Sequence, residues 1–267
     1  PLQAATLSGN QVVLMKGETL IPVISNVDSL QLASNVELGT FPPADNPLGT
    51  GLKGAYGQTG YNQGIKYNKK TYDTGKALLN NLQFFQDNVL NRPYFPSPAA
   101  TPYFDAIGNN GFRSNIRDSA RLLKQIDDIQ IVGCNQGGYD THARQGDVHS
   151  NLLGELSAAL TAFYRHVEKS GAAERVTVMV FSEFGRRVKE NASLGTDHGC
   201  AAPMLLLSGR IKGGLQGPSP DLSSLDRGDL KFTIDFRQVY ATLAEEVLRI
   251  DSKKLLGASF DKLELFT

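Results

Sequence analysis

The chain has 267 residues, of which 40% are hydrophobic and 8% aromatic, an ordinary composition for a globular protein. Its 27 basic residues balance 27 acidic residues, so bulk charge argues against a nucleic-acid or membrane-surface partner. No apolar run approaches the roughly 18 residues that a membrane helix needs. These properties exclude global disorder and a membrane span, and any charge-driven function must therefore be local.

The two cysteines, Cys134 and Cys200, are too few for a disulfide scaffold. Neither stands in a CxxC spacing, which argues against thiolate zinc binding. Cys134 closes an apolar run and is typical of a small buried strand residue.

The first 110 residues give few structural signals. Short apolar runs within residues 1–39 are broken by Gly, Asn and Ser, which predicts short strands in an irregular region. Residues 40–71 are rich in Gly, Pro, Asn and Tyr and predict a long surface excursion. Leucine and phenylalanine at helical spacing predict a helix between residues 73 and 90. We expect one domain over residues 1–267, in which residues 1–110 decorate a core.

Residues 111–267 carry the patterns of that core. Helical periodicity predicts helices over residues 113–126 and 147–170. Apolar runs predict buried strands over residues 129–134, 176–181 and 203–207. A strand, a long crossover helix and a second strand imply parallel pairing, so the expected fold class is a three-layer α/β/α core with a mainly parallel sheet.

The last clear helix begins near Asp235. Asp at the cap and Gln238 three residues later resemble a capping box, in which each side chain binds the backbone of the other residue. Val239, Leu243 and Val247 then line the predicted buried face.

Three polar clusters stand beside the predicted strands. They are Gly137–His142, Ser182–Arg186 and Gly195–Gly199. Loops at the carboxyl ends of parallel strands converge on one edge of a sheet, where ligands bind. Asp, Glu and His are ligands for zinc, manganese or a similar ion. The predicted metal ligands are Asp140, His142, Glu183, Asp197 and His198.

These motifs resemble those of DUF1501, a large family of uncharacterised bacterial proteins in the alkaline phosphatase and sulfatase-like superfamily. The family pattern GG-aromatic-DTH-x-x-Q, SEFGR, GTDHG and KGG matches residues 137–145, 182–186, 195–199 and 212–214 in the same order. The resemblance implies an alkaline-phosphatase-like fold, bound divalent metal ions (zinc, manganese or calcium), transfer of phosphoryl or sulfuryl groups, and a periplasmic or secreted location.

The resemblance also implies roles for single residues. Asp140 resembles the first superfamily metal ligand and His198 the last, while Glu183 stands where the superfamily shows an Asp-His pair. Alternatively, Asp197 and His198 are that pair, displaced by an inserted loop. Glu183 and Arg186 are the predicted catalytic residues, with Arg186 clamping the developing charge. The superfamily nucleophile lies on a first strand that we expect upstream of this chain.

Simpler interpretations stand beside these. Asp140 could be a turn residue after two glycines, and Glu183 could pair with a neighbouring arginine. His149, one turn before an apolar stripe, is typical of a structural histidine near a helix start. His166 next to an arginine is predicted to be solvated.

The leading hypothesis is a metal-dependent hydrolase that acts on a small-molecule or glycan ester of phosphate or sulfate. The alternative is a non-catalytic exported protein that keeps the fold for glycan binding or surface assembly. A metal-dependent mutase or lyase with the same ligands is a third.

Overall fold

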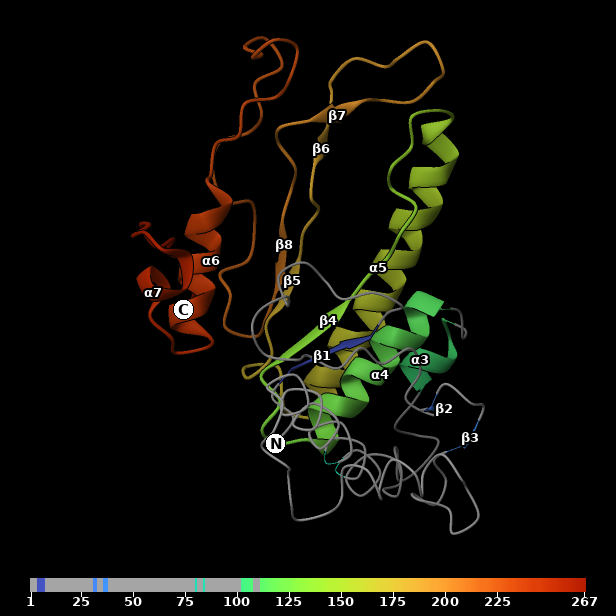
Figure 1. Ribbon diagram of the computed structural model, residues 1–267, viewed down its shortest axis with the longest axis vertical. Coiled ribbons are helices and arrows are strands. Elements are labelled where there is room, and N and C mark those ends of the chain that lie inside the picture. The colour runs from blue at the N-terminus through green and yellow to red at the C-terminus, as the bar shows by residue number, and fades with distance from the viewer. Residues whose placement is uncertain are drawn as a thin grey trace, which may run out of the picture. The chain divides into compact units, whose positions relative to one another are not determined.

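The computed structural model describes residues 4–7, 31–32, 36–37, 80, 84, 102–107 and 111–267 (Figure 1). The predicted excursion at 40–71 lies outside these residues. Of the helix predicted between residues 73 and 90, residues 80 and 84 are described, and both are helical. The chain folds as two compact units, Pro1–Gln136 and Gly137–Thr267.

The first unit combines short strands with helices. Its elements are β1 (Ala4–Leu7), β2 (Gln31–Leu32), β3 (Val36–Glu37), α3 (Pro102–Asp105), α4 (Gly111–Gln125) and β4 (Ile131–Cys134). Strand β1 pairs with β4 in parallel, and β2 pairs with β3 antiparallel. The pairing of β1 with β4 shows that the first residues of the chain contribute a strand to this unit.

Helix α4 confirms the helix predicted over residues 113–126. Ile116 and Ala120 are buried and share one face of the helix, because they stand four residues apart. Leu122, which has no exposed surface, stands about 200° further round, so more than one side of α4 is removed from water. The helix contacts β4 and β1. Ile126, just beyond the helix, donates its N–H to the carbonyl of Leu122 and extends the buried face.

The second unit carries the remaining elements. They are α5 (Gln145–Lys169), β5 (Val178–Val180), β6 (Gly185–Arg186), β7 (His198–Gly199), β8 (Leu205–Leu207), α6 (Phe236–Glu246) and α7 (Ser252–Leu256). Among the helices of the described residues, none is long and apolar enough to cross a membrane.

Helix α5 confirms the prediction over 147–170, with a start two residues earlier. Its buried stripe includes Ala162, Phe163 and Val167. His166 belongs to the same stripe and is 8% exposed, so the prediction of a solvated histidine is wrong. The reason is its position: it follows Ala162 by four residues and Phe163 by three, which puts it on the core-facing side.

Strands β5 to β8 form the two arms of one long hairpin (Figure 1). Val178 pairs with Leu207 and Gly185 pairs with Gly199, both antiparallel. Between the two ladders, residues 181–184 of one arm and 200–204 of the other form no ladder pairs. The connection between the arms, residues 187–197, carries no helix, which accords with antiparallel pairing, because parallel strands are usually joined by a crossover helix.

The described strand pairs therefore form small two-stranded sheets, of which only β1–β4 is parallel. The mainly parallel three-layer sheet expected from the sequence is not shown by these residues. The predicted strands exist, but they are less buried than expected: the residues of β5 are half-buried, and Leu205 in β8 is 48% exposed. A two-stranded ladder covers less of each strand than a wide sheet does.

Helix α6 confirms the predicted capping box. The Asp235 carboxylate accepts from the backbone N–H of Arg237, and the Gln238 side chain accepts from the backbone N–H of Asp235. These bonds satisfy N–H groups that a helix start leaves unpaired. Val239 of α6 is buried, as predicted. Helix α7 packs against helix α6.

Candidate metal site

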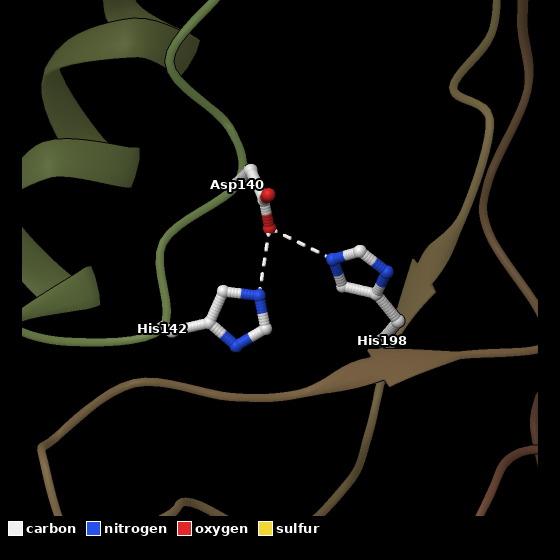
Figure 2. Close-up of side chains that lie close together, drawn as sticks. All are labelled: Asp140, His142 and His198. Carbon is white, nitrogen blue, oxygen red and sulfur yellow. Dashed lines mark hydrogen bonds and ion pairs between the residues drawn. The ribbon is translucent and has the colours of Figure 1, made fainter.

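Three ligand atoms from two separate segments meet at one point of the second unit (Figure 2). Nε2 of His142 lies 2.9 Å from Oδ1 of Asp140, and Nε2 of His198 lies 2.8 Å from the same oxygen. The two imidazole rings are 5.0 Å apart between centroids. In the described part of the chain, this is the group of His, Cys, Asp and Glu side chains close enough to share a metal ion.

The hairpin positions His198, and the segment before α5 positions the other two residues. His198 opens β7, whose pairing with β6 sets its backbone opposite Arg186. Asp140 and His142 stand on the connection that follows Gly138, a residue with a φ of 98° that favours glycine. Between 46% and 58% of each of the three side chains is exposed, so the site is open to solutes.

The ring of His142 lies between two carboxylates. Its Nε2 faces Asp140, and its Nδ1 lies 3.2 Å from Oδ1 of Asp197. A neutral imidazole carries a single N–H and can donate to only one of these two oxygens. The other nitrogen then presents its lone pair to a carboxylate, an arrangement that a cation between the two would stabilise.

Both carboxylates are held in the ionised form. The pKa of Asp140 is lowered first by its hydrogen bond with His198, and further by the nearby charges of His142 and Arg186. The pKa of Asp197 is lowered first by its hydrogen bond with His142 and then by one from Asn191. Ionised carboxylates with oxygens available to a cation are the form that binds metal.

Arg186 fixes the position of Asp140. Its guanidinium lies 3.2 Å from Oδ1 of Asp140 and donates to the backbone carbonyls of Tyr139 and Thr196. The side chain is 15% exposed, and its planar fork spans the two segments that carry the ligands. Arg186 therefore positions Asp140 and holds the two segments of the site together.

Phe184 orients the other histidine. Its ring stacks on His198 with 3.7 Å between centroids and an interplanar angle of 8°. Arg186 approaches the same Phe184 ring, with its guanidinium carbon 5.0 Å from the centroid. The aromatic contact limits rotation of His198 and so directs its Nε2 toward Asp140.

A closed ring of hydrogen bonds supports these segments. Thr196 Oγ1 donates to Gln145 Oε1 over 2.6 Å, and Gln145 Nε2 donates to Nδ1 of His149 over 3.4 Å. His149 in turn donates from Nε2 to the carbonyl of Tyr139 over 3.2 Å. Arg186 closes the ring through the carbonyls of Tyr139 and Thr196. His149 is thus the structural histidine that the sequence predicts.

Glycine permits the loops to approach each other so closely. A Cβ on Gly195 would lie 2.2 Å from the carbonyl carbon of His142, and one on Gly185 would lie 1.7 Å from the carbonyl oxygen of Ala201. Both distances are far inside contact range, so any side chain would push the segments apart. Close packing therefore requires glycine at position 195 of the GTDHG motif and at position 185 of the SEFGR motif.

The five predicted ligands are placed differently from one another. Asp140, His142 and His198 form the cluster, and Asp197 lies on the far nitrogen of His142. Glu183 is exposed and stands outside the group in the described part of the chain. The simpler interpretation of Glu183 pairs it with a neighbouring arginine. One such arginine, Arg186, instead forms an ion pair with Asp140.

Sequence reasoning missed Asn191. Its side-chain nitrogen lies 3.0 Å from the carbonyl oxygen of His142 and 3.4 Å from Oδ1 of Asp197. It stands in a polar loop whose composition resembles many surface loops, so no residue pattern distinguishes it. Phe184 was noted within its motif, but its stacking on His198 depends on hairpin pairing that the sequence did not predict.

A family model described as "Protein of unknown function (DUF1501)" matches residues 119–262, more than half of the chain. The chain belongs to the DUF1501 family. The match includes every DUF1501 motif quoted above and all residues of the candidate metal site. No curated protein and no solved structure gives a significant match to the chain.

The donor set of this DUF1501 protein fits a divalent ion. Two imidazole nitrogens and one carboxylate oxygen are a recurrent set for zinc and for non-haem iron or manganese. Ligand atoms around a tetrahedral zinc ion stand about 3.3 Å apart, so the two distances from Oδ1 of Asp140 to the histidine nitrogens need to lengthen by roughly half an ångström to hold one. Asp197 behind His142 is the outer carboxylate that metal-binding histidines usually have.

Proposed function

We propose that Asp140, His142 and His198 bind a divalent metal ion and that the protein is a metal-dependent hydrolase of phosphate or sulfate esters. The observation that carries the proposal is the ring of His142 between the carboxylates of Asp140 and Asp197. Surface ion pairs in water contribute little stability, so an exposed array of this kind is better explained by a ligand than by folding.

The donors narrow the choice of metal. Calcium takes six to eight oxygen ligands, and two imidazoles are a poor match for it. Imidazole with carboxylate suits zinc, and it also suits manganese with added oxygen ligands. Of the three ions that the sequence suggests, we propose zinc or manganese.

The bound ion would supply Lewis-acid polarisation of a phosphoryl or sulfuryl oxygen. The chain's own residues prepare the site for that task. Asp197 accepts the Nδ1 proton of His142, which leaves Nε2 as the ligand atom. Arg186 holds Asp140, and Phe184 holds His198. The clamp role predicted for Arg186 on developing charge remains a prediction beside this positioning role.

Reaction class and location follow from the family resemblance. The DUF1501 motifs resemble those of the alkaline phosphatase and sulfatase-like superfamily, so we propose a small-molecule or glycan ester as substrate and a periplasmic or secreted location. The mainly parallel three-layer α/β/α architecture is part of the same proposal. Glu183 as a ligand and catalytic residue also remains a prediction, which the variant Glu183→Gln would test in the assay below.

Metal titration tests the proposal first. Purified protein is freed of metal and titrated with Zn²⁺ and Mn²⁺, beside the variants Asp140→Asn and His198→Ala. Asp226→Asn is the matched control, because that carboxylate is 63% exposed against 58% for Asp140 and also pairs with an arginine. We expect one ion per chain in wild type and control, and weak or no binding in the two site variants.

Hydrolysis is then measured on aryl phosphate and aryl sulfate, with the bound metal and after chelation. Turnover that disappears on chelation and in the site variants supports the hydrolase. Metal binding without turnover on either ester would favour the non-catalytic alternative. Equal binding by Asp140→Asn and wild type would remove the site assignment.

A further inference from the structure

The side chain of Asn191 contacts two groups of the metal site at once. Its amide nitrogen lies 3.0 Å from the backbone carbonyl oxygen of His142 and 3.4 Å from the carboxylate of Asp197. We propose that Asn191 is a positioning residue that holds His142 and Asp197 together and so aims the metal-ligating nitrogen. This inference rests on the proposed metal site and extends it to a residue that touches no metal.

The orientation of the amide is determined by its other end. Oδ1 of Asn191 accepts the backbone N–H of Ser193 over 2.9 Å and that of Gly195 over 3.1 Å. Because both of these partners are donors, the oxygen must face them and the NH₂ group must face the opposite side. A flipped amide would set oxygen against the oxygens of His142 and Asp197. The side chain therefore donates to the site and accepts from its own loop.

The loop that Asn191 organises also begins helix α5. The N–H of Asn191 donates to the carbonyl of Gly195, and the N–H of Leu194 donates to the carbonyl of Asn191. The carbonyls of Ser193 and Leu194 then accept the N–H groups of Arg144 and Gln145 over 3.0 and 2.8 Å. Arg144 has a φ of 48° and no side-chain cap, so this loop supplies the partners of the helix start.

Asn191 thus connects the segment that carries His142 with the segment that carries Asp197. The hydrogen bond between their side chains, 3.2 Å long, depends on both backbones keeping their places. If that bond weakens, the ring of His142 can turn and its Nε2 leaves the ligand position. Outer residues that orient metal-ligating histidines typically contribute 10-fold to 100-fold in metal affinity.

Two variants separate the donor role from the loop role. Asn191→Asp keeps the oxygen that accepts from Ser193 and Gly195 but replaces the donating NH₂ with an oxygen. Asn191→Ala removes both. Asn151→Asp, an exposed position on α5, is the matched control for the added charge. Thermal unfolding of the metal-free proteins checks that each variant folds.

Zn²⁺ affinity is measured by competition with a chromophoric chelator, and Co²⁺ absorption reports the geometry of the bound set. We expect Asn191→Asp and Asn191→Ala to lose about 10-fold to 100-fold in affinity and to alter the Co²⁺ spectrum, while Asn151→Asp stays at wild type. Wild-type affinity and spectrum in a folded Asn191→Asp protein would overturn the inference.

A second readout needs no metal. The chain has four histidines, so the ¹⁵N signals of His142 can be assigned with one His142→Ala variant. We expect the Nδ1–H tautomer in wild type and a mixture of tautomers in Asn191→Asp. If wild type binds neither Zn²⁺ nor Co²⁺, the proposed function fails, while this signal still decides whether Asn191 positions His142. An unchanged tautomer in both variants would refute the positioning role.

Discussion

The loops of the candidate metal site hold exposed polar side chains, whereas the packed elements enclose theirs. In α6, the hydroxyl of Thr242 has no exposed surface, donates to the carbonyl of Gln238 and accepts the N–H of Leu263. In the site loops, Asp140 and Asp197 are 58% and 61% exposed, and their partners are other charged or polar side chains.

This difference separates groups that stabilise the fold from groups that we propose bind a ligand. An enclosed hydroxyl must be satisfied by nearby backbone, and each such bond contributes to folding. Exposed carboxylates and imidazoles are already solvated by water, and holding them together gains little. Their convergence in loops fixed by glycine and Asn191 is therefore the feature that points to function. Substitutions in the two regions should accordingly separate stability from metal binding.

The largest expected effect is a loss of both stability and metal binding. Gly185→Ala places a Cβ 1.7 Å from the backbone oxygen of Ala201, so the arms of the hairpin must separate. We expect the free energy of unfolding to fall by about 3 kcal/mol, at the upper end of overpacking effects, and Zn²⁺ binding to be lost. Urea unfolding and metal titration measure the two losses.

Gly154→Ala provides the control for this change. A Cβ at Gly154 meets nothing within 4 Å, and the residue is an exposed position inside α5. Alanine favours the helix over glycine by about 1 kcal/mol, so stability should rise and Zn²⁺ affinity should stay constant. A Gly185→Ala protein that is as stable as Gly154→Ala would contradict the close approach.

Local signals explain which parts of this structure were predictable. The helices over residues 113–126 and 147–170 have apolar stripes, and the capping box of Asp235 and Gln238 lies within four residues. All three helices were predicted because neighbours in sequence decide them. The three residues of the cluster, which we propose as metal ligands, were also among the predicted site residues, because their motifs adjoin predicted strands.

Long-range contacts explain what was missed. His142 bonds to Asp197 across 55 residues, and Asn191 bonds to His142 across 49. No periodicity reports such contacts. The antiparallel hairpin was missed because the apolar run that becomes β8 gives no sign of its partner. His166 was misread because the adjacent arginine outweighed its place in the stripe.

The second prediction concerns the enclosed hydroxyl of α6. Thr242→Val keeps the shape of the side chain but leaves the N–H of Leu263 without its acceptor. We expect a loss of about 2 kcal/mol in the free energy of unfolding, with Zn²⁺ affinity unchanged. Thr161→Val, at an exposed position of α5, should be nearly neutral. A weakened metal site in Thr242→Val would show that the two regions are not independent.

The smallest effect comes from the two cysteines, one in each kind of region. Burial raises the pKa of Cys134 from 9.0 to about 11, a hydrogen bond with Ser119 opposes the rise, and the charge of Asp118 adds to it. Cys200, two residues after His198 in the sequence, is exposed. Cys134 is half-buried, and the thiolate is the reactive form, so iodoacetamide at pH 8 should label Cys200 faster than Cys134 in the folded protein. Equal labelling rates of both cysteines in the folded protein would contradict the raised pKa of Cys134.

The same shift makes stability depend on pH. Because the folded state raises the pKa of Cys134, its contribution is fully present below pH 9 and is lost as pH rises toward 11. Between those values the unfolded chain releases a proton that the folded chain keeps. The free energy of unfolding therefore falls by about 1 kcal/mol by pH 10. Urea unfolding of wild type and Cys134→Ala at pH 7 and pH 10 measures this, with Cys200→Ala as the control. Between pH 7 and pH 10, wild type should lose about 1 kcal/mol more stability than Cys134→Ala does. An equal loss in both proteins would mean that the thiol is open to water.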